Sequence, residues 1–190
     1  MNNFAVALLL GLIAACYSST TNLDFIQQLS DNRTYWIFNT SYMWDQYTLC
    51  HHYKKYKRPS DSPLILKHVY EVYDNLTVSP PPTLKEYSLW RVEGMANTSD
   101  KFLFTRMRDR LNITYKLEYW NETQKCFIFT FNVSDTEQCE LDVWDKLPEI
   151  EANVSSCLVE LAKMPSCKAS RYYFYDNCDH PSKRRRERSN

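Results

Sequence analysis

Short segments in which apolar and polar residues alternate cover most of the chain between residues 35 and 145. A period of two is typical of β-strands with one buried and one exposed face. Clusters rich in Pro, Ser and Asn separate the segments, at residues 58–63, 79–82 and 97–100. Strands are predicted near residues 35–42, 46–53, 64–73, 84–93, 102–108, 112–120, 126–133 and 139–145.

The periodicity becomes helical near the C-terminus. Val154, Cys157, Leu158 and Leu161 fall on one face of a predicted helix at residues 154–164, with Asn153 as its N-cap and Pro165 at its end. A shorter helix is predicted at residues 24–29. The order is therefore seven or eight antiparallel strands followed by a helix. We predict an all-β fold: an eight-stranded antiparallel up-and-down barrel with a short N-terminal helix and a C-terminal helix packed outside.

Asn-X-Ser/Thr sequons are far more frequent than chance, which predicts roughly 2 of them. A sequon accepts a sugar only in a secretory lumen and only where the Asn faces water. We therefore expect a secreted glycoprotein. The sequons are at Asn32, Asn39, Asn75, Asn97, Asn112, Asn121, Asn132 and Asn153.

The N-terminus supports secretion. Residues 4–15 form an uncharged apolar run followed by small residues, which is typical of a signal peptide and too short for a membrane span. We predict a signal peptide at residues 1–18, one domain at 19–180 and a basic disordered tail at 181–190. Two alternatives stay open: a lipoprotein cleavage box ending at Cys16, and binding of the tail to acidic glycans or lipid headgroups.

The cysteines and the net charge narrow the function. Once Cys16 leaves with the signal peptide, six cysteines remain, which indicates three disulfides in any of 15 connectivities. Close CxxC or HxxxH spacing does not occur, so no metal site is expected. The net charge of zero gives no field that would favour nucleic acid. Hydrolase, P-loop and dinucleotide motifs are missing too, so we expect neither an enzyme nor a cofactor.

The sequons also set the phase of the strands, because a glycosylated Asn must point outward and its neighbours inward. The inward set is unusually aromatic, with a few polar groups. A barrel of eight strands can be filled by such side chains or can hold one small ligand, and both readings stay open. The expected inward residues are Trp36, Phe38, Thr40, Leu66, His68, Tyr70, Val72, Glu86, Ser88, Trp90, Val92, Ile113, Tyr115, Leu117, Tyr119, Phe127, Phe129, Phe131 and Val133.

Several local motifs resemble those of the salivary lipocalins of ticks, the histamine-binding protein family. The resemblance covers most of the mature chain and rests on Tyr35-Trp36, Tyr47-Thr-Leu-Cys50, Lys125-Cys126-Phe-Ile, Cys139-Glu-Leu141, Cys157 and Cys178. It implies a lipocalin barrel. The family pairing implies disulfides Cys50–Cys178 and Cys126–Cys157, with Cys139–Cys167 as the additional pair found in some members.

Amine-binding members of that family carry an Asp and an aromatic residue at two positions where this chain has Phe127 and Asp142, while Glu140 matches their pattern. A buried ammonium needs a carboxylate partner, so the loss of the Asp weakens the amine reading. Glu140, Asp142 and Glu86 are possible substitutes. The missing Asp and the many sequons are similar to the sterol-carrying, dendritic-cell-modulating branch of the family.

We therefore expect a secreted, monomeric lipocalin that sequesters a lipid or a sterol such as cholesterol and modulates a host's immune response. Two alternatives are a scavenger of histamine or serotonin, and a protein-binding immunomodulator that acts on a host immune-cell protein. The expected ligand-binding residues are Trp36, Phe38, Trp90, Tyr115, Leu117, Phe127, Phe129 and Phe131, with Tyr119, Glu140 and His68 as polar orienting groups.

Overall fold

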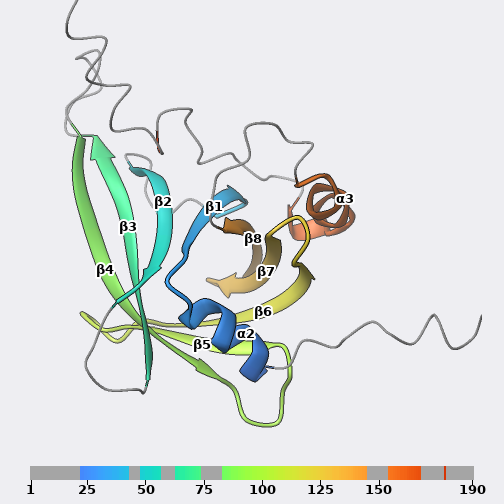
Figure 1. Cartoon of the computed structure of the whole chain (residues 1–190), viewed down its shortest axis with the longest axis horizontal. Coiled ribbons are helices and arrows are strands. Elements are labelled where there is room, and N and C mark those ends of the chain that lie inside the picture. The colour runs from blue at the N-terminus through green and yellow to red at the C-terminus, as the bar shows by residue number, and fades with distance from the viewer. Residues whose placement is uncertain are drawn as a thin grey trace, which may run out of the picture.

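Eight antiparallel strands pair in chain order and close into a barrel (Figure 1), as the sequence predicts. The strands are β1 Thr34–Thr40, β2 Thr48–Lys55, β3 Leu64–Tyr73, β4 Thr83–Gly94, β5 Lys101–Arg106, β6 Asn112–Asn121, β7 Cys126–Val133 and β8 Thr136–Trp144. The computed structural model describes residues 22–42, 48–56, 63–73, 83–144, 154–167 and 178. The expected signal peptide, the basic tail, Asn75 and Asn153 lie outside these residues.

Local sequence explains how the strands connect. Ser134 and Asp135 form the two-residue link between β7 and β8, and both have positive φ, at 50° and 63°. Two positive φ angles in a two-residue hairpin produce a twist that matches the twist of the flanking strands. Asp tolerates this conformation because its short polar side chain can bond locally. The link therefore sets the register in which Val133 lies opposite Thr136.

A short helix, α2 (Asn22–Ser30), closes one end of the barrel (Figure 1). Phe25 of this helix is fully buried, and its ring centroid lies 4.8 Å from Phe102, 5.3 Å from Phe127 and 5.4 Å from Phe129. The Tyr35 hydroxyl donates to the backbone carbonyl of Gln28 and ties the helix to β1. Aromatic packing around Phe25 therefore fills the interior at this end, which we call the α2 end.

A second helix, α3 (Ser155–Lys163), packs outside the barrel against β6 and β7. Val154, Cys157 and Leu161 are buried and Leu158 is partly buried, which confirms the helical face that the sequence predicts. A 3-10 turn, η2 (Pro165–Cys167), follows. Three disulfides join the wall to these segments: Cys126–Cys157, Cys139–Cys167 and Cys50–Cys178, the same pairs that the resemblance implies.

The expected phase of β1 is wrong. Tyr35 and Ile37 belong to the interior cluster, whereas Trp36 and Phe38 pack outside the wall with the disulfides and α3. The sequence argument assumed that Asn39 faces water, but Asn39 is only 3% exposed. The register shifts between Ile37 and Asn39, so that Asn39 lies opposite Leu141, on the covered outer side of the barrel.

Tyr119 is also on the wrong side in the sequence prediction. The register shifts between Leu117 and Tyr119, so that Leu117 packs against the interior while Tyr119 packs against the outer cluster. A bulge of this kind adds one residue and reverses the alternation beyond it. The sequon at Asn112 therefore sets the phase correctly only as far as Leu117.

We predict that the Cys126–Cys157 disulfide makes a large contribution to stability. The two cysteines are 31 residues apart, and closing such a loop in the unfolded chain is worth about 4 kcal/mol in the chain-entropy model. A Cys126→Ser, Cys157→Ser double variant should lose about this much free energy of unfolding in a urea titration. A loss below about 1 kcal/mol would contradict the prediction.

Candidate functional site

A cavity of about 680 Å³ lies at the end of the barrel opposite the α2 end, which we call the far end. β5 pairs with β4 only from Trp90 to Gly94, so β3 and β4 continue past β5 toward this end. The cavity lies next to the part of β3 and β4 that extends beyond β5. Its lining comes from Thr48 and His51 on β2, His68, Tyr70 and Val72 on β3, residues 86–90 of β4, and residues 106–109 at and after the end of β5.

Two buried histidines form one part of the lining. His51 Nδ1 lies 3.0 Å from His68 Nε2, and His51 Nε2 lies 2.9 Å from Thr48 Oγ1. The ring of Tyr53 stacks on His68 at 4.6 Å, and that of Tyr70 stacks on His51 at 5.6 Å. Burial, followed by the nearby charge of His51, lowers the pKa of His68 well below its usual range. His68 is therefore neutral at pH 7 and presents a hydrogen-bonding group without a charge.

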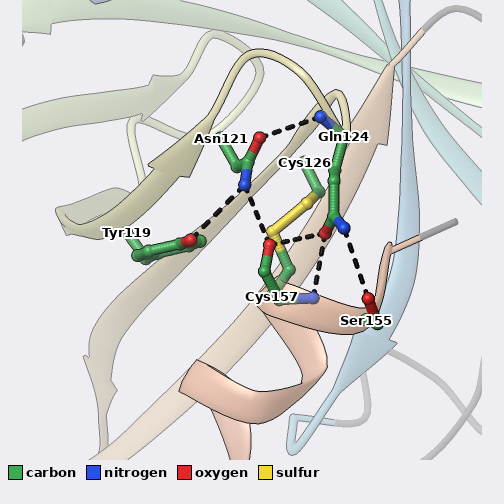
Figure 2. Close-up of a disulfide and its surroundings, with 7 residues drawn as sticks. Tyr119, Asn121, Gln124, Cys126, Ser155 and Cys157 are labelled. Atoms are coloured by element: carbon green, nitrogen blue, oxygen red, sulfur yellow. Dashed lines mark hydrogen bonds between the residues drawn. A yellow bond between two sulfur atoms is a disulfide. The ribbon is translucent and has the colours of Figure 1, made fainter. Parts of the chain in front are cut away.

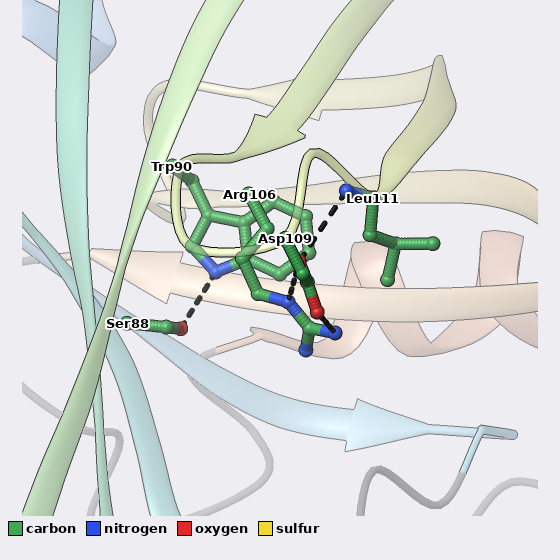
Figure 3. A network of polar contacts seen from close by, with 5 residues as sticks. All are labelled: Ser88, Trp90, Arg106, Asp109 and Leu111. Carbon is green, nitrogen blue, oxygen red and sulfur yellow. Dashed lines mark hydrogen bonds and ion pairs between the residues drawn. The ribbon is translucent and has the colours of Figure 1, made fainter.

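Trp90 forms the apolar face of the cavity, and a polar network holds it in place (Figure 3). Its Nε1 donates to Ser88 Oγ at 2.8 Å, and the Arg106 guanidinium lies 5.6 Å from its ring centre. Arg106 Nε and Nη2 donate to the Asp109 carboxylate at 2.8 and 2.6 Å, while the backbone N–H of Leu111 donates to the same carboxylate. The hydrogen bond from Arg106 lowers the pKa of Asp109 to about 2. This ion pair closes the turn after β5 and neutralises its two charges.

A hydroxyl and a carboxylate complete the polar part of the lining. The Tyr70 hydroxyl donates to Glu86 Oε2 at 3.4 Å, across the β3–β4 pair. Burial and then the neighbouring Glu86 charge raise the pKa of Tyr70, which keeps its hydroxyl protonated. The cavity thus combines one large aromatic face with hydrogen-bonding groups that are already engaged with one another.

A second polar feature lies deeper, in the filled part of the interior. Glu140 and Asp142 of β8 are both buried, at 0% and 1% exposure. Burial, followed by the Glu140 carboxylate, raises the pKa of Asp142 well above its usual range. Burial and the same two carboxyl groups raise the pKa of Tyr53. Tyr53 is thus close enough to feel the charge of this carboxyl pair, and its ring also stacks on His68 of the cavity lining.

The structure divides the expected ligand-binding residues into three groups. Trp90 and His68 line the cavity. The others that face inward belong to the packed interior, where Phe129 lies 5.1 Å from Tyr115 and 5.2 Å from Phe127. Trp36, Phe38 and Tyr119 lie outside the wall. The packed interior residues are Tyr115, Leu117, Phe127, Phe129, Phe131 and Glu140.

Sequence reasoning missed His51, Thr48 and Arg106 as cavity residues. β2 carries no sequon, so its phase was not set, and a register shift lies between Leu49 and His52. Cys50 within this bulge has a positive φ of 56°. The adjacent His51 and His52 were one available signal, because neighbouring side chains of a strand face opposite ways. In the structure His51 lines the cavity, whereas His52 stacks on Trp36 outside the wall.

Neither a metal centre nor a membrane helix is found within the described ranges. No group of three or more His, Cys, Asp or Glu side chains there could hold a metal ion. No helix among those residues is both long enough and apolar enough to cross a bilayer.

His52, on the outer face, should make stability depend on pH. It stacks on Trp36 at 4.4 Å, and burial lowers its pKa to about 4. In the unfolded chain His52 takes up a proton below about pH 6.5, whereas in the folded protein it does so only near pH 4. The free energy of unfolding should therefore fall by about 3 kcal/mol on acidification through this window.

The His52→Gln variant should lose most of this pH dependence in urea titrations at pH 4.5 and pH 7. The quantity to compare is the difference in the free energy of unfolding between pH 7 and pH 4.5, because the variant also loses the ring stacking on Trp36 at both pH values. His68 contributes a further fall of the same sign, which stays in the variant. An unchanged pH dependence would show that His52 is not the titrating group.

Comparison with known proteins bears on the fold. No family model matches this chain. No curated protein matches its sequence. Among solved structures, the chain is similar to japanin from Rhipicephalus appendiculatus bound to cholesterol, a tick salivary lipocalin. The sequence identity is 9%, the TM-score is 0.50, and the match covers 76% of this chain and 93% of that chain. Together with the closed barrel of eight antiparallel strands and its two flanking helices, this match establishes that the chain has the lipocalin fold.

Proposed function

We propose that the protein is a secreted carrier that sequesters a small amphipathic molecule, a sterol or another lipid, in the cavity at the far end of its barrel. Removal of such a molecule from host tissue would modulate the host's immune response. The cavity next to Trp90 is the observation that carries this proposal. Its volume falls within the range of roughly 300–1,000 Å³ that small-molecule sites occupy.

The chemistry of the lining supports an amphipathic ligand. Trp90 and Val72 offer apolar surface, whereas His68, Ser88 and Tyr70 offer hydrogen-bonding groups. A ligand hydroxyl can bond to these groups without bringing a charge into the barrel. The ion pair between Arg106 and Asp109 is internally neutral, so the cavity does not depend on a charged ligand for balance.

The comparison with japanin supports the same class of ligand. That protein has the same fold and was solved with cholesterol bound. The three disulfides agree with an oxidising, extracellular compartment, because such bonds persist there and are rare in the cytosol. A carrier in this compartment would act by binding its ligand, not by converting it.

The Ser88→Phe substitution should weaken lipid binding. It places a ring in the cavity and removes the acceptor for Trp90 Nε1. Native mass spectrometry of wild-type protein secreted from eukaryotic cells should detect a co-purifying lipid. Titration with a fluorescent sterol should then give at least a tenfold weaker Kd for the variant, about 1.4 kcal/mol.

Arg91→Phe serves as the control, because it adds the same ring on the outer side of the same strand. Arg91 is exposed and pairs with Glu93. This variant should bind the sterol like the wild type. Wild-type protein that is secreted without any lipid and does not bind the sterol would contradict the carrier function.

A second candidate function is the binding of a biogenic amine, and the buried pair of Glu140 and Asp142 favours it. An aromatic interior disfavours the charged form of a carboxyl group, because a buried charge loses its hydration. A protonated amine beside the pair would compensate for this loss. Among the described residues, Tyr53 and rings of the aromatic core pack around the pair, so binding of an amine there would require these side chains to move.

For the amine function, calorimetry with histamine and serotonin should detect saturable binding that the Glu140→Gln variant weakens at least tenfold. Glu137→Gln is the matched control, since Glu137 lies on the same strand and is exposed. Equal affinities for both variants would show that the buried carboxyl group is not the counter-ion. Absence of heat with either amine would exclude this candidate and leave the carrier function intact.

A further inference from the structure

The sequon at Asn121 differs from the exposed sequons because the Asn121 side chain forms hydrogen bonds that connect β6 to α3. Asn121 ends β6, close to the point where α3 begins, and is half-buried (Figure 2). Its Nδ2, the atom to which an N-linked sugar attaches, donates to Ser156 Oγ at 2.9 Å and approaches the Tyr119 hydroxyl at 3.4 Å. Its Oδ1 accepts the backbone N–H of Gln124 at 2.8 Å.

Gln124 extends this network to the first turn of α3 (Figure 2). Its Oε1 accepts the backbone N–H of Ser156 at 2.9 Å, and its Nε2 donates to Ser155 Oγ at 3.3 Å. The first backbone N–H groups of a helix have no partner within the helix, and here the N-cap residue Val154 supplies no side-chain bond. Gln124 therefore acts as the cap of α3. We call Asn121, Gln124, Ser155 and Ser156 the α3 joint.

A disulfide fixes the α3 joint in place. Cys126 lies two residues after Gln124, Cys157 follows directly after Ser156, and both cysteines are fully buried. The disulfide between them holds their Cα atoms 6.4 Å apart. The helix therefore cannot move away from Asn121 while the bridge is intact.

N-glycosylation replaces one of the two hydrogens on Nδ2 with a sugar, which a lipid-linked oligosaccharide donates as its diphosphate lipid leaves. One N–H stays on the amide afterwards, so only one of the two contacts of Nδ2 can survive. The sugar would have to occupy the place of Ser156 Oγ or of the Tyr119 hydroxyl, and both residues are partly buried.

We propose that glycosylation of Asn121 and docking of α3 exclude each other, so that the secreted, folded protein carries no sugar at Asn121. A chain that accepts a sugar there cannot build the α3 joint. Cys157 is then held away from Cys126, and the chain fails to close this disulfide. Asn121 thus makes the attachment of α3 sensitive to a modification that takes place before folding.

Other sequons offer a matched comparison. Asn112 is exposed, and its Oδ1 accepts from Thr105 Oγ1 at 2.8 Å, which leaves Nδ2 directed elsewhere. Asn32, Asn97 and Asn132 are exposed as well. We expect these four positions to carry sugars.

The test uses two substitutions that destroy a sequon without touching its Asn. Thr123→Ala removes the sequon of Asn121, and Thr114→Ala removes that of Asn112; both threonines are exposed. Each full chain is secreted from eukaryotic cells, and its glycans are counted by mass spectrometry. Thr114→Ala should lose one glycan, whereas Thr123→Ala should lose none and keep the wild-type melting temperature.

Two further variants test the joint itself. Asn121→Ala should lower the melting temperature although it removes no sugar. Ser156→Ala breaks the joint, so sugar should appear at Asn121 in the secreted protein. Secreted wild-type protein with both a sugar at Asn121 and an intact Cys126–Cys157 bridge would overturn the proposal, and so would a Ser156→Ala variant with no sugar there.

Discussion

Pairing of β8 with β1 closes the sheet, and every other feature of the molecule depends on this closure. A closed barrel has no free edge, so its backbone groups are paired all around the ring. Closure also gives each strand an inner and an outer side. Rings from strands that are not neighbours then meet inside, as Tyr35 and Phe127 do, with centroids 6.0 Å apart. The outer side becomes the surface on which α3 and the disulfides pack.

The interior is divided unevenly along the barrel. At the α2 end, Phe25 and the rings around it leave the space filled, whereas the far end keeps a cavity with mixed chemistry. The layer of Tyr53 and His68 marks the boundary between the two parts. Most of the aromatic residues that the sequence places inside form a packed core, whereas the cavity is lined by Trp90, two histidines and an ion pair.

The sequence predicted the strand order and the outer helix because alternation and helical period are local signals. It also placed Trp90 and His68 correctly, since β3 and β4 pair without interruption from Leu64 to Tyr73. The failures at Trp36, Phe38 and Tyr119 each lie at or beside a bulge, where an extra residue reverses the phase. Bulges depend on contacts between strands and leave no clear trace in one strand's sequence. The burial of Asn39 shows the other weak point, since a sequon does not by itself show that the side chain is exposed.

The position of Phe25 has a consequence for the order of assembly. Phe25 precedes every strand in the chain, yet its ring rests on Phe127 and Phe129 of β7. Synthesis therefore delivers this residue about a hundred residues before the surface that receives it, and contacts so distant in sequence form slowly. Until β7 and β8 have been synthesised, the barrel cannot close and α2 has no surface against which to pack, so the apolar interior is exposed. The nascent chain thus waits in an open form, accessible to the enzymes of its compartment, for most of its synthesis.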